Sequence, residues 1–252
     1  MIGTILVILY RRPGYTAKVL EALAAQPEIG QFHVHFQIDG CVKDVINQAV
    51  DFNATTKSIN INGQNARCTL NVYTGLCVAF SMSDFVIVVE DDTVPAHDFL
   101  KYMLWARPFI DDDCRTISAY HKYENCPPRD YHVVRFMPRW CAWGWATTRK
   151  HWEVAKQVWD WDTRVSWYLM IAINYFWQRK TIMPMLSRCR NIGRLDGTYT
   201  VNPEQHDRDV MVHAWADSVD TEDKPFEFVP GLREGEETMW DQSRDILYRD
   251  LK

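Results

Sequence analysis

The stretch Phe85-Val-Ile-Val-Val-Glu-Asp-Asp92 decides the fold of this chain. Its five consecutive apolar residues predict a strand that is buried on both faces, which is typical of a parallel sheet covered by helices. The three acids follow at the carboxyl end of that strand, where open α/β sheets bind ligands. Neighbouring carboxylates repel one another, so a bound Mg²⁺ or Mn²⁺ would stabilise them, and such ions usually accompany a phosphorylated substrate. Alternatively, the three acids form a solvated turn after the strand and bind no metal.

Strands and helices alternate on either side of this stretch, from residue 4 to about residue 105. The predicted strands are residues 4–10, 32–38, 58–62 and 85–89, and the predicted helices are residues 15–26, 43–52 and 66–81. This alternation predicts an α/β fold with a mixed, mostly parallel sheet, right-handed crossovers and flanking helices. Pro95 is predicted to open a further helix.

The rhythm changes beyond about residue 111. Strands are predicted at residues 116–120 and 181–184, and helices at residues 147–158, 163–178 and 237–251. Residues 192–208 are polar and contain two Gly and one Pro, which suggests a lid over a binding site.

Composition limits the partners and the compartment. A net charge of −5, from 28 basic and 33 acidic residues, indicates no general attraction to nucleic acid or anionic membranes, although a local basic patch is compatible with it. The seven cysteines lack CxxC spacing and predict reduced thiols. No apolar stretch reaches about 18 residues, so no membrane segment is expected. Together these features predict a cytoplasmic protein, in a bacterium or a virus-infected cell.

Polar residues also follow the other predicted strands. Asp39, with Gly40, would accept hydrogen bonds from a base or ribose, or would simply form a turn. Arg11 and Arg12 would complement a diphosphate, or would be solvated surface charges. The segment Trp140-Cys-Ala-Trp-Gly-Trp-Ala146 suits rings that face a sugar pocket, or a Trp-rich corner of the core.

Two acids and two histidines complete the candidate residues. Asp160 and Asp162 lie among tryptophans, where a raised pKa would suit a general base, although Asp162 could simply cap a helix. His206 and His213 lie in or after the predicted lid, where either could complete a metal site or be a surface histidine. The absence of GxSxG, P-loop and GxGxxG motifs disfavours hydrolase, NTPase and Rossmann functions.

The ordered set of segments resembles the GT-A-fold glycosyltransferases related to N-acetylglucosaminyltransferase I and their shorter bacterial and viral relatives. The resemblance covers about residues 4–215, through TILVILYRRPGY, FQIDG, VIVVEDDTVPAHDFLKYM, WCAWGWATTRKHW, the Trp-Asp pair at 161–162 and MPMLSRCRNIGRLDGTYT. It implies a single domain over residues 1–252. A nucleotide-binding half would reach about residue 110, an acceptor and catalytic half would span about 111–215, and a charged extension would cover 216–252.

The resemblance implies a role for each matching residue around the donor. Asp92 would ligate the metal, with Glu90 and Asp91 near the ribose and the metal. Asp39 would hold a uracil ring, and Arg12 would lie against the diphosphate.

Other roles concern catalysis and closure. Asp162 would be the catalytic base, with Asp160 as the alternative, and Asn191 and Gly193 would begin a loop that orders over the nucleotide. Several relatives end this loop with Thr-His-Thr, whereas Thr198-Tyr199-Thr200 stands here and leaves His206 or His213 as substitute metal ligands.

The implied activity is the Mn²⁺- or Mg²⁺-dependent, inverting transfer of a sugar, of hexosyl or N-acetylhexosaminyl type, from a UDP-sugar to a hydroxyl group. The acceptor would be a surface glycan or polysaccharide, or a 5-hydroxymethylpyrimidine in phage DNA, for which the basic, aromatic stretch 129–139 could supply contacts. A sugar-1-phosphate nucleotidyltransferase and a non-catalytic carbohydrate-binding relative are the alternatives.

Overall fold

The computed structural model describes residues 1–121, 126–138, 140–159, 161, 175–195, 202–211 and 213–229. The strands are β1 (Gly3–Leu9), β2 (Phe32–Asp39), β3 (Thr56–Asn62), β4 (Phe85–Glu90), β5 (Thr93–Pro95), β6 (Cys114–Ser118), β7 (Val133–Met137), β8 (Trp145–Thr148), β9 (Lys180–Pro184), β10 (Cys189–Asn191) and β11 (Glu227–Phe228). The helices are α1 (Pro13–Ala24), α2 (Lys43–Asp51), α3 (Arg67–Met82), α4 (Phe99–Ala106), α5 (Arg149–Ala155) and α7 (Pro203–His206), the last of which continues into a π-helical turn at Asp207–Met211.

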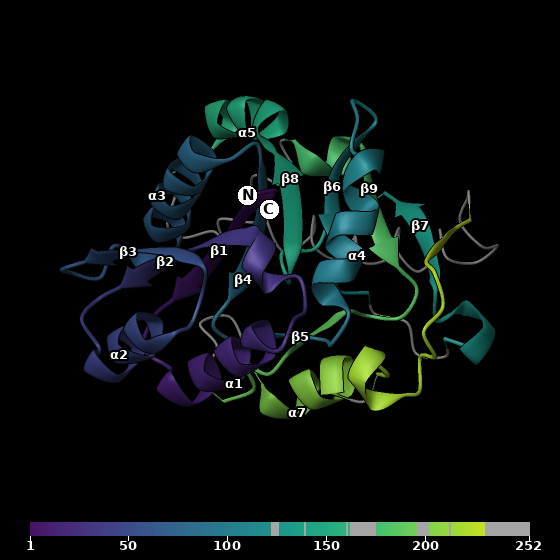
Figure 1. The fold of residues 1–252 in the computed structure, drawn as a ribbon, viewed down its shortest axis with the longest axis horizontal. Helices are drawn as coiled ribbons and strands as arrows, with labels where there is room; N and C mark the ends of the chain where they lie inside the picture. The colour runs from purple at the N-terminus through teal and green to yellow at the C-terminus, as the bar shows by residue number, and fades with distance from the viewer. Residues whose placement is uncertain are drawn as a thin grey trace.

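A single large sheet runs through the described residues in the order β11-β7-β9-β6-β8-β4-β1-β2-β3 (Figure 1). The four strands at one end, β4, β1, β2 and β3, are all parallel. The direction reverses at β8, which is antiparallel to both β4 and β6. A separate two-stranded ribbon pairs β5 with β10. The prediction of a mixed, mostly parallel sheet flanked by helices is therefore confirmed.

The helices cover both faces of the sheet because the central strands are apolar on both sides. Successive residues of β4 alternate between two buried clusters: Ile87 and Val89 belong to one and Val86 and Val88 to the other. The first cluster includes side chains of α1, α2 and α4, and the second includes side chains of α3 and α5. Burial of apolar area on both faces is the main stabilising term for such a layered fold.

Two predicted helix starts are wrong, and both errors have the same cause. Pro95 ends β5, and the next helix begins only at Phe99. Thr147 and Thr148 belong to β8, where Thr147 lies opposite Val86, and the helix begins at Arg149. Both short strands exist because a distant segment pairs with them, and local sequence does not carry that information.

Other predictions shift by a few residues or lie beyond the described part of the chain. The strand predicted at 116–120 is β6, at Cys114–Ser118. The predicted helix 237–251 and most of the predicted helix 163–178 lie outside the described residues. Within the described part of the chain, no helix combines the length and the apolar character that crossing a membrane requires.

Candidate active site

The carboxyl ends of the parallel strands meet at one edge of the sheet, and the strand register brings the predicted residues together there. Glu90 lies opposite Ile8 of β1, and Leu9 lies opposite Ile38 of β2. Arg12, Asp39 and the acids Glu90–Asp92 therefore leave three adjacent strands at the same level. Such an edge is the usual ligand-binding position of an open α/β sheet.

The three acids form a crowded anionic cluster. Asp91 is 3% exposed and Asp92 is 7% exposed. Desolvation, followed by repulsion from Asp92 and Asp91, raises the pKa of Glu90 to about 8. Desolvation also raises the pKa of Asp91, although Arg12 opposes that shift. The cluster therefore needs a cation or a proton near neutral pH.

Arg12 supplies a cation at this position. Its Nε donates to Asp91 Oδ2 at 3.2 Å, and its Nη2 donates to Asp91 Oδ1. Its Nη1 lies 2.8 Å from Asp92 Oδ2. Burial alone would lower the pKa of this guanidinium, but the two carboxylates outweigh that cost and raise it above its ordinary value. Arg12 is fixed in place because Pro13 begins α1 directly after it.

The β5–β10 ribbon brings a second group of predicted residues to the other side of Asp92. Asn191 pairs with Thr93, and its Nδ2 donates to Asp92 Oδ1 at 3.1 Å. The backbone N–H of Ile192 donates to the Asp92 carbonyl at 2.7 Å. A Cβ at Gly193 would lie only 2.4 Å from Asp92 Oδ2, so only glycine allows this close approach.

His206 joins this group through Asn191. Its Nε2 lies 3.2 Å from Asn191 Oδ1, which also accepts the N–H of Gly193 at 2.9 Å. Arg194 donates through Nε to both oxygens of Asp207, at 2.8 and 2.9 Å, so the described ends of the predicted lid are tied to each other. Whether this segment closes over a ligand remains a prediction.

His213 is buried at 8% exposure beyond the π-helical turn, and its backbone N–H donates to the Val210 carbonyl at 3.4 Å. Its role as a metal ligand also remains a prediction. Within the described ranges, no three His, Cys, Asp or Glu side chains are grouped so that they could hold a metal ion together. A metal at this edge would accordingly take few protein ligands. That fits Mg²⁺-type sites, which use one or two carboxylates and fill the remaining positions with water and substrate phosphates.

Asp39 lies beside residues that the sequence did not single out. Its Oδ1 accepts the N–H of Ala66 at 2.7 Å, directly before α3. Asn65 donates to the Tyr10 hydroxyl at 2.8 Å, and Gly40 adopts a positive φ of 79°. Tyr10 and Asn65 thus border the predicted base-binding position. The only sequence signal for Tyr10 was its place at the end of the first predicted strand.

The start of α3 also borders the acid cluster. Burial raises the pKa of the half-buried Cys68 thiol, and the nearby charges of Glu90, Asp91, Asp39 and Asp92 raise it further. Farther along the helix, the Asn71 side-chain oxygen accepts from Gln37 at 2.9 Å and from Asn62 at 2.8 Å. This network ties α3 to β2 and β3 below the predicted base-binding position.

The tryptophan-rich segment 140–146 lies mostly in the core, whereas the next tryptophan pair along the chain reaches the surface at Trp161. Trp140 and Trp145 are 4% and 0% exposed, and they pack edge to face with their ring centroids 4.9 Å apart. This packing is what the alternative of a Trp-rich core corner predicts. Trp143 is half-buried and contacts Tyr120 at 4.6 Å. Trp161 is 53% exposed and packs on Tyr73 at 4.8 Å. Its neighbours Asp160 and Asp162, the predicted catalytic acids, lie outside the described residues.

The basic stretch 129–139 contributes less positive surface than its sequence suggests. Arg135 is 6% exposed, whereas the side chain of Arg129 is 82% exposed. Arg139 is outside the described residues. A buried arginine is not available to contact a phosphate backbone.

Comparisons with solved structures identify the fold. The chain is similar to a mannosyltransferase, PcManGT from Pyrobaculum calidifontis, solved with GDP-Man and Mn²⁺, at 15% identity over 78% of this chain and 59% of that one, with a TM-score of 0.51. It is also similar to residues 1–349 of S. aureus TarS, solved with UDP-GlcNAc, at 11% identity over 93% of this chain and 60% of that one, with a TM-score of 0.53. The chain therefore has the GT-A fold, and it matches about 60% of the length of these proteins. No family model and no curated protein sequence matches the chain.

Proposed function

We propose that this chain is a glycosyltransferase that moves a sugar from a nucleotide sugar to an acceptor hydroxyl group. The observation that carries the proposal is the acid cluster Glu90–Asp92 at the carboxyl end of β4 on a GT-A fold, in which the buried Asp91 and Asp92 both contact Arg12. The similar chains of known structure support the donor class, since one holds GDP-Man with Mn²⁺ and another holds UDP-GlcNAc.

The donor that we propose is a UDP-sugar carrying a hexose or an N-acetylhexosamine. Asp39 would accept the N–H of the uracil ring, with Tyr10 beside it and Gly40 leaving room for close approach. Arg12 would turn from Asp92 to the diphosphate, because its guanidinium can form two parallel hydrogen bonds with phosphate oxygens. Asn191 would hold Asp92 in place through its 3.1 Å hydrogen bond.

The proposed cofactor is Mn²⁺ or Mg²⁺, with Asp92 as its direct protein ligand and Glu90 and Asp91 close to it. When bound, the ion would neutralise the charge that develops on the leaving diphosphate. We propose His206 as a residue that positions Asn191, which it contacts at 3.2 Å. His213 is kept only as an alternative metal ligand.

We further propose that Asp162, or Asp160, removes the proton from the acceptor hydroxyl, which then attacks the anomeric carbon from the side opposite the leaving group. A single displacement of this kind inverts the configuration of the sugar. The acceptor is a glycan or polysaccharide, or alternatively hydroxymethylated DNA in a virus-infected cell. The burial of Arg135 favours the glycan. We propose the cytoplasm as the compartment.

The test is the release of UDP from a panel of UDP-sugars, with Mn²⁺ or with a chelator, and with glycan or hydroxymethylcytosine DNA acceptors. We expect release that requires the metal and that Asp92→Ala abolishes. The control Asp51→Ala, at the exposed end of α2, should leave it unchanged.

Other outcomes would identify the alternatives. Pyrophosphate release from UTP and a sugar 1-phosphate would identify a nucleotidyltransferase. UDP binding without turnover of any donor would identify a non-catalytic relative. A chain that neither binds UDP with Mn²⁺ nor releases it would disprove the proposal.

A further inference from the structure

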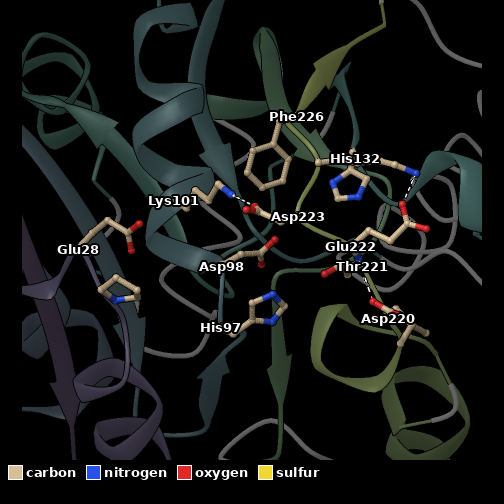
Figure 2. Close-up of a pocket in the computed structure, with 13 residues that line it drawn as sticks. Glu28, His97, Asp98, Lys101, His132, Asp220, Thr221, Glu222, Asp223 and Phe226 are labelled. Carbon is tan, nitrogen blue, oxygen red and sulfur yellow. Dashed lines mark hydrogen bonds and ion pairs between the residues drawn. The ribbon is translucent and has the colours of Figure 1, made fainter.

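A cavity lies at the amino end of α4 (Figure 2), and Glu90, Asp91 and Asp92 are not among the residues that line it. Its volume is about 480 Å³, within the range of small-molecule sites. Four parts of the chain that are distant in sequence enclose it: the turn after α1, the start of α4, His132, and the segment 219–226. Figure 2 shows side chains from these parts directed toward one another across the space.

Three residues that line this cavity carry buried acceptor atoms without hydrogen-bond partners: Glu28 Oε2, Asp98 Oδ1 and His132 Nδ1. The other carboxylate oxygen of Asp98 lies 2.9 Å from Nε of the fully buried Arg188, and this contact fixes the carboxylate in place. Desolvation lowers the pKa of His132, whose ring also hydrogen-bonds to the backbone of Thr221. A neutral imidazole has one acceptor nitrogen, and Nδ1 takes that role where Nε2 carries the proton.

These acceptors define the ligand chemistry that the cavity would complement. The three atoms have almost no accessible surface in the ligand-free structure, so a ligand would reach them by turning their side chains toward the cavity. Because a buried acceptor without a partner is unfavourable, a ligand that brings several donors would favour that turn. The lining also holds five carboxylates against two lysines, of which Lys101 is paired with Asp223 at 2.7 Å, so a phosphate group would be repelled. Phe226 adds an apolar ring to the wall.

We propose that this cavity is a saccharide-binding subsite, which holds a neutral or amine-bearing sugar unit through hydrogen bonds to Glu28, Asp98 and His132. Hydroxyl groups on different carbons supply donors in several directions, as acceptors on three separate segments require.

The position of the cavity suggests what the bound sugar does. His97 follows Asp92 by five residues, so their Cα atoms are at most about 18 Å apart. That span matches a few units of an oligosaccharide. We assign the subsite to the glycan acceptor, and this assignment, unlike saccharide binding itself, rests on the proposed function.

The test is saccharide binding by calorimetry or saturation-transfer NMR, without donor and with a metal chelator. The panel contains glucose, N-acetylglucosamine, glucosamine and cellobiose, with putrescine and inorganic phosphate as alternative chemistries. We expect at least one saccharide to bind with a millimolar or lower Kd. Glu28→Gln and His132→Gln should each weaken that binding at least tenfold, because each loses one acceptor. The control Glu21→Gln, on an exposed part of α1, should not change it.

The inference is overturned if no saccharide binds, if only putrescine or phosphate binds, or if Glu28→Gln and His132→Gln bind as tightly as the unaltered chain while retaining its melting temperature. UDP release is measured in parallel with the same variants. Loss of saccharide binding with intact UDP release would concern this subsite alone, whereas intact saccharide binding without any UDP release would refute only the proposed function.

Discussion

Arg12 lies where the proposed metal ion would act, since it already neutralises Asp91 and Asp92. Mn²⁺ added alone must displace this guanidinium from Asp92. We therefore expect Arg12→Gln to bind Mn²⁺ at least tenfold more tightly in the absence of nucleotide. The same variant should bind UDP more weakly in the presence of Mn²⁺, because the diphosphate loses a cationic partner. Electron paramagnetic resonance of free Mn²⁺ measures the first effect, and calorimetry measures the second.

Arg11 offers the matched control for this prediction. It is exposed and lies over the Tyr10 ring at 5.3 Å rather than against the acids. Arg11→Gln should leave Mn²⁺ affinity unchanged. Equal Mn²⁺ affinities for Arg12→Gln and the unaltered chain would show that the arginine does not compete with the metal.

Gly193 gives a second prediction at the scale of one residue. Alanine would place a Cβ 2.4 Å from Asp92 Oδ2, so the carboxylate must move away from its present position. We expect Gly193→Ala to weaken Mn²⁺-dependent UDP binding at least tenfold. Gly63→Ala is the control, because nothing lies within 4 Å of the added carbon there. Tight, metal-dependent UDP binding by Gly193→Ala would contradict the assignment of Asp92.

At the scale of the elements, a buried histidine where β2 pairs with β3 makes the free energy of unfolding depend on pH. His35 is 1% exposed, and its Nδ1 lies 2.8 Å from Ser58 Oγ. Desolvation, with a smaller effect of His33, lowers the pKa of His35 to about 4. As the pH falls, His35 is therefore protonated near pH 6.5 in the unfolded chain but only near pH 4 in the folded chain. The contribution of His35 to the free energy of unfolding is fully present above pH 6.5, and it is lost as the pH falls from there toward pH 4.

This linkage predicts a loss of about 3 kcal/mol in the free energy of unfolding between pH 6.5 and pH 4 from His35 alone. A His35→Gln variant should lose correspondingly less over the same window. Urea denaturation at a series of pH values measures the difference. Parallel stability curves for the variant and the unaltered chain would mean that His35 titrates normally in the fold.

The elements also show which parts of the fold the sequence could predict. The parallel strands β1 and β4 can be predicted from their continuous apolar runs, and β2 and β3 from β-prone residues that alternate with polar ones, because each strand is defined by its own residues. The strands β5 and β8 were missed, since each is short and exists through pairing with β10, or with β4 and β6. A three-residue strand such as β5, whose partner lies about a hundred residues away, leaves no recognisable pattern in the local sequence.

The candidate site divides in the same way. Arg12, Asp39 and the acids Glu90–Asp92 could be placed together from strand order alone, because they follow adjacent parallel strands. The contact of Asn191 with Asp92 crosses 99 residues and could not be predicted, since the resemblance implied only that Asn191 begins a loop over the nucleotide. Tyr10 and Asn65 could not be found, since one tyrosine or asparagine after a strand has many structural uses.

At the scale of the whole molecule, the proposed ligands would join segments from both ends of the described chain. The site combines β1 and β4 with the β5–β10 ribbon and α7. We expect UDP with Mn²⁺, at about 100 times its Kd, to add about 2.7 kcal/mol of stability and raise the melting temperature by about 5–10 °C. Differential scanning fluorimetry measures this shift, which should vanish in Asp92→Ala. A shift that persists in that variant would place nucleotide binding elsewhere.

The rate at which the Cys68 thiol is alkylated depends on the charge of the neighbouring acid cluster. Alkylating reagents attack the thiolate, and a thiol surrounded by burial and carboxylates ionises reluctantly. Iodoacetamide should therefore label Cys68 far more slowly than the exposed Cys41, which follows Gly40 at the same sheet edge. The labelling ratio of these two cysteines, read by peptide mass spectrometry, would report the electrostatic state of the site without any nucleotide or substrate.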